Sequence, residues 1–399
     1  MGLSEISSST NADKLFVSST QKQAELEYLA SNVLQNGMKL YQKEDYEGAA
    51  RAFKGALSMA PSASFSKDSA KYLAMAQMKL GHTEKAIDAY QTSIKYNPDL
   101  ADPHVDLAKL YFGEKRYKEA SLEYEKAVNL DPSSNNRYSL GQAYLFQDRY
   151  AEAETEFQEV RRLEPDSPYS FFGLGLAYSK QGRYEQAVEV FKEAVNRDRE
   201  FYDAYAEMGY AYADSGEMEA AEQVFEILEE ESPDLADTLS RYMYKVDPPK
   251  ISFASSMSTF NYMAPRMTKV SNLDAYLENA DAKKTFTMIF QFDKKMDRLS
   301  VENRFNWKIS RAEGSNPGEA YNFDLPMPST EVSIPSFADN VFWDEGTMTA
   351  KLQFTIQQNA SADGTIDPSH MEFKFAGVDE YGLTMDPEGD QYTGFSKVY

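Results

Sequence analysis

A period of about 34 residues runs through roughly the first 245 residues, and it restricts the possible folds more than any other feature of the sequence. Prolines end alanine-containing stretches at Pro61, Pro98, Pro132, Pro165 and Pro233, at successive spacings of 37, 34, 33 and 68 residues. The last spacing is twice the period, because Arg199 stands where a further proline is due. Such a period predicts a repeat architecture, in which each unit packs against its two neighbours.

Each repeat unit carries two small residues and one aromatic residue at fixed places. The first small residue recurs at Gly37, Ala74, Ala108, Gly141, Gly175 and Gly209, the second at Ala49, Ala86, Ala120, Ala153, Ala187 and Ala221, and the aromatic residue follows four positions later at Phe53, Tyr90, Tyr124, Phe157, Phe191 and Phe225. Small residues allow two helices to approach closely, and aromatic rings fill the space between helices. We therefore expect each unit to be a pair of helices, with Gly81, Gly182 and Gly216 in the turns of three pairs.

This pattern resembles the tetratricopeptide repeat, with six units at about 30–63, 67–100, 101–133, 134–167, 168–201 and 202–235. The segment SPDLADTLSRYMYKV then has the character of a capping helix, which a terminal repeat needs to cover its open face. The resemblance implies an all-α solenoid over residues 22–246, wound as a right-handed superhelix with a concave groove.

In the tetratricopeptide family, peptides usually bind the groove, which the first helix of each pair lines. Carried onto this sequence, the lining residues are Met38, Tyr41, Met75, Met78, Lys109, Phe112, Gln142, Leu145, Leu176 and Tyr210. Most of them are apolar, so the resemblance implies a protein or peptide partner that presents an apolar helix or strand. Some family members hold a C-terminal carboxylate with a Lys/Asn/Arg set, but only Lys71 fits that set, and Met75 stands where asparagine is needed. The alternative is that these residues pack against copies of the same chain.

Helical periodicity stops at Asp247-Pro248-Pro249, and from Thr285 onward apolar residues recur at every second position. We expect a linker of irregular structure at 247–282 and an all-β sandwich at 283–399, which makes the chain a multidomain α + β protein. The strands expected to share one buried face carry Phe286, Met288, Phe290 and Phe292; Phe305, Trp307 and Ile309; Ala350, Leu352, Phe354 and Ile356; and Met371, Phe373 and Phe375. Shorter strands are expected at 330–335, 340–343 and 394–399.

Two motifs of this region are similar to the bacterial Ig-like domain of S-layer and other surface proteins. The first comprises Phe290, Phe292, Asp293, Met296, Asp297, Ser300 and Val301, and the second comprises Gly377, Val378, Asp379 and Gly382. The resemblance covers about 283–387 and implies a spacer or adhesion module of a bacterial protein located outside the cytoplasm.

Composition argues against several classes of function. The formal net charge of -23 repels phosphate backbones and anionic lipid, so we expect binding neither to nucleic acid nor to a membrane surface. No run of about 18 apolar residues occurs, so we expect no membrane insertion. The chain has no cysteine, and His82, His104 and His370 are far apart in the sequence, so we expect no metal site and no cofactor. The acidic loops at Asp363/Asp367 and Asp386/Glu388/Asp390 could hold Ca²⁺, but solvated turns are the favoured interpretation.

Catalytic residues are not expected anywhere in the chain. Asp367, Ser369 and His370 contain the residue types of a hydrolase triad, but neighbours on a turn and a strand are expected to point apart. No glycine-rich phosphate-binding loop is present either, since the glycines at repeat turns serve the turns.

The first 21 residues are rich in serine and threonine and are expected to form a flexible tail, with a long helix beginning near Gln21. They show no basic stretch followed by an apolar one, so no classical secretory signal is expected. The leading hypothesis is a non-enzymatic interaction scaffold or structural protein, bacterial and extracytoplasmic, that belongs to a surface appendage such as the flagellum. The alternatives are a cytoplasmic adaptor for secretion or signalling, and a self-assembling surface-layer or filament subunit.

Overall fold

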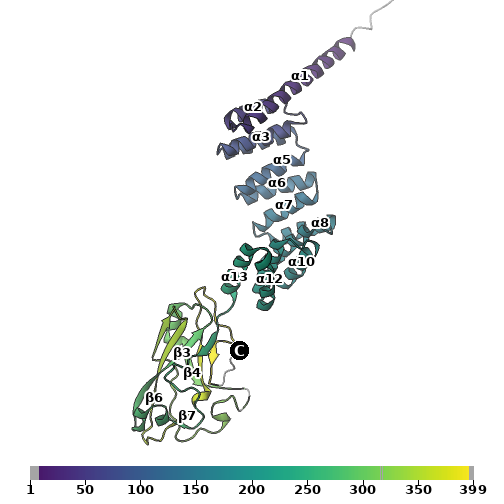
Figure 1. The fold of residues 1–399 in the computed structure, drawn as a ribbon. Coiled ribbons are helices and arrows are strands. Elements are labelled where there is room, and N and C mark those ends of the chain that lie inside the picture. Colours follow the sequence, from purple (N-terminus) through teal and green to yellow (C-terminus); the bar gives the residue numbers. More distant parts are fainter. Residues whose placement is uncertain (1–8, 315, 317, 395–399) are drawn as a thin grey trace, which may run out of the picture. The chain divides into compact units, whose positions relative to one another are not determined.

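The structure, a computed structural model, describes residues 9–314, 316 and 318–394. The chain divides into two compact units, residues 1–240 and 241–399 (Figure 1). The first unit is helical, and the second is built mainly from antiparallel sheets.

Thirteen α-helices follow one another along the described part of the first 246 residues. They are α1 Ser9–Gln42, α2 Tyr46–Met59, α3 Ser66–Lys79, α4 Thr83–Tyr96, α5 Ala101–Gly113, α6 Tyr117–Leu130, α7 Ser134–Leu145, α8 Tyr150–Leu163, α9 Pro168–Lys180, α10 Tyr184–Arg197, α11 Tyr202–Ser215, α12 Met218–Glu231 and α13 Pro233–Val246. Each helix from α1 to α12 packs against the next, which gives six pairs stacked as a solenoid (Figure 1). The predicted all-α solenoid of helix pairs is confirmed.

The turns inside the helix pairs need a residue in the left-handed region. Gly81, Gly182 and Gly216 have φ of 74°, 72° and 84°, as the sequence predicted for three of the pairs. Three further pairs place Glu44, Lys115 and Asp148 there, with φ between 58° and 63°. Glycine is therefore favoured in this turn but is not required.

Small residues and rings pack within the repeats as the sequence pattern predicts. Ala187 and the five alanines at equivalent positions are fully buried, as are Phe53, Phe157 and Phe191. A methyl group added to Gly175 would lie 2.3 Å from the Phe191 ring, well inside contact distance. Phe157 is confined twice, because a methyl group on Gly141 or on Gly173 would lie within 2.8 Å of its ring. Each ring thus fixes how closely helices can approach.

An Arg–Tyr–Glu contact repeats between neighbouring helix pairs. The Arg183 guanidinium lies 4.1 Å from the Tyr178 ring centre, and its Nη1 donates to Glu154 Oε2 of the preceding pair at 2.8 Å. Arg149 lies in the same way on Tyr144, with Glu125 at 3.9 Å. A third contact of this kind joins Arg116, Tyr111 and Glu84. Cation–π stacking and an ion pair at each junction complement the apolar packing.

The predicted flexible tail over residues 1–21 is wrong from Ser9 onward, because α1 begins there rather than near Gln21. No glycine or proline occurs between residues 3 and 36, so nothing in the sequence interrupts the helix. Residues 1–8 lie outside the described part of the chain. Residues 21–29 of α1 are almost entirely exposed, since the helix runs on beyond its contact with α2 (Figure 1).

The second unit contains nine short strands among its described residues. They are β1 Ile251–Ala254, β2 Thr268–Lys269, β3 Lys283–Phe292, β4 Trp307–Arg311, β5 Asn340–Asp344, β6 Thr349–Gln357, β7 Thr365–Ile366, β8 Met371–Phe375 and β9 Gln391–Tyr392. One sheet has the order β1-β3-β6-β5 and a second has the order β4-β8-β9, while β2 and β7 form a separate pair. All neighbouring strands within these sheets are antiparallel. A short helix, α14 Arg298–Glu302, precedes β4.

The two larger sheets pack face to face through aromatic rings. Phe290 of β3 stacks on Trp307 of β4 at 5.3 Å between ring centres, and Phe292 of β3 meets Phe375 of β8 at 5.5 Å. Phe354 of β6 contacts the second sheet in the same way. The predicted buried faces of β3, β6 and β8 are confirmed, since none of their predicted core residues is more than 1% exposed. On the β4 segment, Phe305 is 61% exposed, because it lies in a 3-10 turn before the strand begins.

The linker predicted at 247–282 is wrong. This segment supplies β1, which extends the first sheet beside β3, and β2, which pairs with β7. Phe260, Val270 and Leu277 are buried in the core of the second unit, and the Phe260 ring lies 5.1 Å from Phe354. The segment is therefore part of the β unit, although its strands are too short to show an alternating pattern.

One further predicted strand differs from the structure, since residues 330–335 run beside β7, with Val332 N donating to Thr365 O at 3.0 Å, but make no strand. For the strand predicted at 394–399, residues 395–399 lie outside the described part of the chain. The last strand among the described residues is β9 at Gln391–Tyr392.

A buried cation organises one end of the β unit. Lys294 Nζ lies 2.7 Å from Asp379 Oδ2 and donates to the carbonyl oxygens of Tyr244 and Asp247, also at 2.7 Å. The rings of Tyr244 and Tyr381 lie 5.0 and 5.7 Å from the ammonium group. Because a buried charge is tolerated only when its partners are all in place, these contacts fix residues 244–247 against β-unit loops.

The close contact between Gly175 and Phe191 generates a stability prediction. Gly175→Ala should destabilise the protein by about 1–3 kcal/mol, because the added methyl group overpacks the ring. Adding Phe191→Leu should make the combined cost smaller than the sum of the two single costs. Gly113→Ala is the matched control, since a methyl group added at Gly113 would have no neighbouring atom within 4 Å. Urea denaturation measures all four variants, and equal midpoints for Gly175→Ala and Gly113→Ala would contradict the assigned register.

Candidate functional site

An open hollow of about 600 Å³ lies on the first helices of the first three repeats. Its walls come from α1, α3, α4 and α5, and the lining residues are Tyr41, Lys71, Ala74, Met75, Met78, Lys79, Tyr90, Asp106, Lys109 and Leu110. A smaller hollow of about 280 Å³ shares Lys71, Tyr90, Asp106 and Lys109 with it and extends to Asn136 of α7. The two hollows together form a groove across three first helices, α3, α5 and α7.

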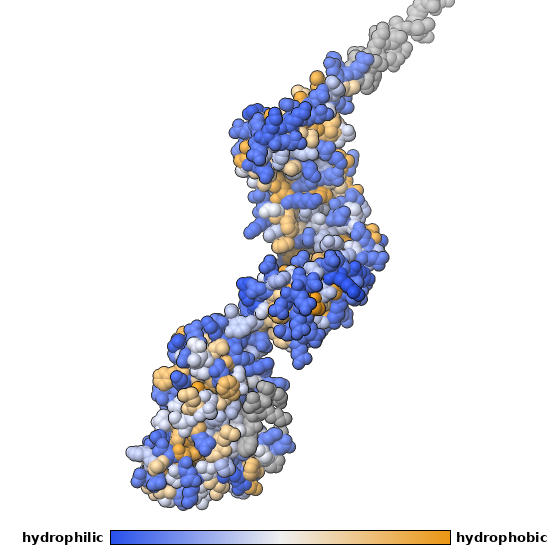
Figure 2. Space-filling model, viewed as in Figure 1, coloured by the Kyte–Doolittle hydropathy of each residue, from blue (hydrophilic) through white to orange (hydrophobic). Residues whose placement is uncertain are grey.

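One wall of this groove is apolar. Tyr41 comes from the last turn of α1, Met75 and Met78 from the later turns of α3, and Leu110 from the later turns of α5. Met75 is 38% exposed, while Tyr41 and Met78 are half-buried. Figure 2 shows a hydrophilic surface over most of the helical unit, with hydrophobic side chains gathered at the level of α5 to α7. Methionine side chains adapt to ligands of different shape, so this wall suits an apolar side chain of a partner.

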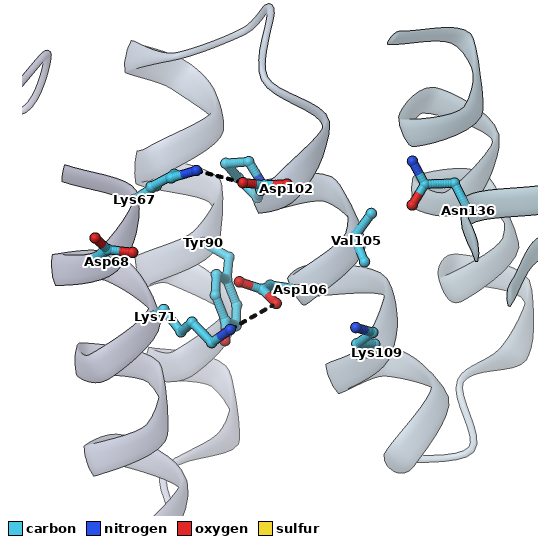
Figure 3. A pocket seen from close by; sticks show the side chains of 10 residues that line it. Lys67, Asp68, Lys71, Tyr90, Asp102, Val105, Asp106, Lys109 and Asn136 are labelled. Atoms are coloured by element: carbon cyan, nitrogen blue, oxygen red, sulfur yellow. Dashed lines mark hydrogen bonds and ion pairs between the residues drawn. The ribbon is translucent and has the colours of Figure 1, made fainter. Parts of the chain in front are cut away.

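The opposite wall is charged (Figure 3). Lys67 Nζ donates to Asp102 Oδ2 at 2.6 Å, which closes one pair between α3 and α5. Lys71 Nζ lies 3.7 Å from Asp106 Oδ1, and Figure 3 shows Asp106 between Lys71 and Lys109. These residues come from the earlier turns of α3 and α5, apart from Lys109. A ligand in the groove therefore meets fixed charges of both signs beside the apolar wall.

Burial shapes the ionisation of two groups in the groove. The pKa of Asp106 is raised above its usual value, mainly by burial, although the charges of Lys71 and Lys109 oppose the shift. Burial also raises the pKa of the Tyr90 hydroxyl, and the negative charge of Asp106 adds to that effect. Asp106 is thus a carboxylate that the fold holds at a cost in free energy, which marks it as a candidate functional group.

The structure brings four of the predicted groove residues together: Tyr41, Met75, Met78 and Lys109 all line the larger hollow. The other six lie elsewhere along the solenoid. Met38, Phe112 and Leu145 are partly buried against the helical core, and Phe112 packs between Tyr117 and Phe146 at 5.2 and 5.1 Å. Gln142 and Leu176 are half-buried, and Tyr210 OH donates to Thr238 Oγ1 at 3.1 Å. Whether these six contact a partner stays a prediction.

Sequence reasoning singled out Lys71 and Lys109 but missed Asp102 and Asp106, and with them the charged wall as a whole. Lys71 lies three positions before the small residue Ala74, and Asp106 and Asp102 lie two and six positions before Ala108. Those positions share the groove face with the predicted ones, which lie one and four positions after the small residue. The repeat register could therefore have found them, but charged residues on an amphipathic helix are normally assigned to solvent.

The expectation that Asp367, Ser369 and His370 point apart is wrong. Ser369 Oγ donates to Asp367 Oδ1 at 2.9 Å, and His370 Nδ1 lies 2.8 Å from Asp367 Oδ2. The turn before β8 is a 3-10 turn, which folds the three side chains together. Each is only 1% exposed, and His370 Nε2 lies 3.1 Å from the Gly318 carbonyl oxygen. The three side chains form an internal hydrogen-bonded network that is buried in the structure.

The acidic loops do not converge on a cation site. Asp386 pairs with Lys250 at 3.3 Å, Asp390 pairs with Lys374 at 3.0 Å, and Asp363 accepts a hydrogen bond from Asn359. In the part of the chain that the structure describes, no three carboxylates, histidines or cysteines come together as metal ligands. Among the same residues, no helix combines the length and apolarity needed to cross a bilayer.

Comparison with protein families supports the tetratricopeptide character of the helical repeats. Family models described as tetratricopeptide repeats match residues 76–115, 101–134, 138–200 and 172–236. These segments match the tetratricopeptide repeat family. None of these matches extends to the β unit, and no curated protein sequence matches the chain.

Several solved structures are similar to this chain. A tetratricopeptide repeat protein from Parabacteroides merdae is 17% identical with a TM-score of 0.46, over 54% of this chain and 88% of that one. PilW, described as a type IV pilus biogenesis factor, is 19% identical with a TM-score of 0.44, over 53% and 98%. YrrB, described as a TPR protein with an unusual peptide-binding site, is 20% identical with a TM-score of 0.40, over 48% and 99%. Since all three scores are below 0.5, the repeat assignment rests on the family models.

The raised pKa of Asp106 generates a prediction about pH. A carboxyl group whose pKa is higher in the folded state stabilises the fold below its unfolded pKa, and that contribution is lost as pH rises through the folded pKa. Asp106→Asn should therefore raise the free energy of unfolding relative to wild type at pH 7 and lose this advantage at pH 3. Urea denaturation at both pH values measures the difference. Asp68→Asn removes the same charge from an exposed position of the groove and is the control. An equal effect of Asp106→Asn at both pH values would contradict the assignment.

Proposed function

We propose that the chain is a non-enzymatic protein–protein interaction scaffold whose first three tetratricopeptide repeats bind a segment of a protein partner in the hollow around Met75 and Met78. The hollow of about 600 Å³ is the observation that carries this proposal, because it has the size and the partly apolar lining of a ligand site. Apart from Tyr90 of α4, its residues come from the consecutive first helices α1, α3 and α5, so the site exists only when the repeats are stacked.

The two walls of the groove define the kind of partner. The apolar wall comes from later turns of α1, α3 and α5, where Lys79 and Lys109 also line the hollow, and the charged wall comes mainly from earlier turns of α3 and α5. Because the first helices stack side by side, each wall continues from one repeat to the next. A ligand that lies along the groove contacts the apolar wall on one side and the charged wall on the other. An amphipathic helix or an extended strand with alternating apolar and polar side chains can contact both walls.

We further propose that the β unit is an Ig-like sandwich. Without β2 and β7, seven strands remain, and they can be lettered A to G in chain order. The first sheet, β1-β3-β6-β5, then has the order ABED, and the second sheet, β4-β8-β9, has the order CFG. These are the two sheets of an immunoglobulin constant-type domain. The fully buried Trp307 lies on the third strand, β4, where that fold places a core tryptophan. The two Ig-like sequence motifs also lie side by side, since Asp297 N donates to Val378 O at 3.1 Å.

An Ig-like module supports a role as spacer or adhesion domain, and with it a location outside the cytoplasm, on a bacterial surface appendage such as the flagellum. We predict that tagged full-length protein will appear in the sheared-filament or supernatant fraction of its native bacterium. Western blotting of these fractions beside a cytoplasmic marker measures this. Protein confined to the marker's fraction would favour the cytoplasmic adaptor.

Self-assembly is the second candidate function, and the free stretch of α1 favours it. Leu26, Tyr28 and Leu29 are 41%, 69% and 47% exposed on residues 21–29 of α1, a mostly exposed helical segment. Association with a second copy would bury these apolar side chains and so stabilise the segment. Mass photometry across a dilution series separates the two candidates, since a scaffold for another protein stays a single species.

The hollow generates a binding prediction. A random-peptide display library selected on the full-length chain should yield peptides that alternate or cluster apolar residues, with micromolar affinity. The double variant Met75→Gln/Met78→Gln keeps side-chain length but makes the wall polar, so it should bind these peptides at least tenfold more weakly, about 1.4 kcal/mol. Phe305→Gln changes an exposed side chain of the β unit and serves as control. If both variants bind the peptides with the same affinity as wild type, the peptides do not bind in this hollow.

A further inference from the structure

The later repeats carry a strip of aromatic rings on their first helices. Tyr138 of α7 lies 6.4 Å from Tyr169 of α9, and Tyr169 lies 5.2 Å from Phe201, which precedes α11. Phe172 of α9 closes the strip, at 4.8 Å from Phe201. Tyr169 is 55% exposed, and it supplies most of the ring surface that the strip presents to solvent. Tyr138, Phe172 and Phe201 are partly buried and pack against the helical core.

The aromatic strip occupies the same places in the repeat as the charged wall of the first repeats. Tyr138 and Phe172 lie three positions before Gly141 and Gly175, as Lys71 lies three before Ala74. Tyr169 lies six positions before Gly175, as Asp102 lies six before Ala108. The groove face of the solenoid therefore changes from charged to aromatic between the third and the fourth repeat.

Carboxylates continue this face beyond the strip. Asp203 and Glu207 on α11 lie six and two positions before Gly209, in the register of Asp102 and Asp106. Burial and the nearby Asp203 raise the pKa of Glu207, and Lys180 is the cation that opposes them. Residues 200–240 contain thirteen carboxylates and no lysine, arginine or histidine, so the potential at this end is strongly negative.

We propose that the aromatic strip and the carboxylates Asp203 and Glu207 form a second binding surface, for an arginine-containing basic segment of a partner protein. A guanidinium group stacks on tyrosine and phenylalanine faces and also pairs with carboxylates, which matches the two chemistries side by side here. The chain itself uses the same contact nearby, since the Arg197 and Arg161 guanidinium groups lie 4.0 and 4.9 Å from the Phe171 ring. An acidic segment would be repelled, and an uncharged apolar one would leave the carboxylates unpaired.

This surface is separate from the Met75/Met78 hollow and does not depend on its function. The test measures fluorescence anisotropy of labelled peptides of four Gly-Ser-Arg units, and of their lysine and glutamate counterparts, against the full-length chain. The arginine probe should bind at least threefold more tightly than the lysine probe, and the glutamate probe should not bind. Tyr169→Ala should weaken the arginine probe about two- to fivefold, as expected for an exposed cation–π contact.

Matched charge variants separate this surface from the general negative field. Asp203→Asn/Glu207→Gln should weaken the arginine probe at least fivefold. Glu229→Gln/Glu230→Gln removes the same charge from exposed positions of α12 and should have little effect. Met75→Gln/Met78→Gln should leave the probe's affinity unchanged, which keeps this test independent of the first hollow. Thermal unfolding followed by circular dichroism verifies that each variant is folded.

Three outcomes would overturn the proposal. The first is equal affinity for the arginine and lysine probes together with no effect of Tyr169→Ala, which would leave only charge attraction. The second is an equal loss of affinity in the Asp203/Glu207 and Glu229/Glu230 variants. The third is the absence of arginine-probe binding by the wild-type chain at low ionic strength.

Discussion

The contact between a ring on the second helix of a repeat and a small residue on the first helix is the interaction on which the helical unit depends. Phe157 makes this contact both within and between repeats. Its ring leaves no space for a methyl group at Gly141 of its own repeat or at Gly173 of the next repeat. One side chain thereby sets the separation within a repeat and between repeats. The first helices are then held side by side, and only this makes Lys71 of α3 and Asp106 of α5 neighbours in one groove.

The groove is not chemically uniform, and this distinguishes the repeats from one another. The first three repeats present methionines beside paired charges, the fourth and fifth present rings, and the sixth presents carboxylates. The packing positions repeat because helix separation must be the same everywhere, whereas the groove positions are free to differ. A single partner that spans the whole groove would need an apolar segment followed by a basic one. Two partners could equally occupy the two ends together.

The sequence predicted most of the helical unit and less of the β unit, for a physical reason. Contacts such as Gly175 with Phe191 join residues close in sequence at a fixed period, so the pattern alone reveals them. In the β unit, alternation identified β3, β6 and β8, but β1 and β2 are too short to alternate, and their partners lie far along the chain. In the groove, apolar residues such as Met75 could be assigned from the repeat register, because their positions on the first helices are known. The sequence around Asp106 is that of an exposed acidic residue, and only the packing of α3 beside α5 shows that Asp106 lies in the groove. The Asp367–His370 contact depends on a 3-10 turn that the residues around it do not predict.

The uneven charge of the solenoid has a consequence for its dynamics. In a stack where each unit touches only its neighbours, the end units open most readily, and hydrogen exchange should be fastest there. The sixth repeat is the last repeat of the helical unit, and the thirteen carboxylates of residues 200–240 repel one another without a cation in that segment to offset them. Fraying of this repeat would therefore slow as ionic strength rises. A cation bound at Asp203 and Glu207 would stabilise the folded form of this repeat. Ligand binding and the folding of this end would therefore be thermodynamically coupled.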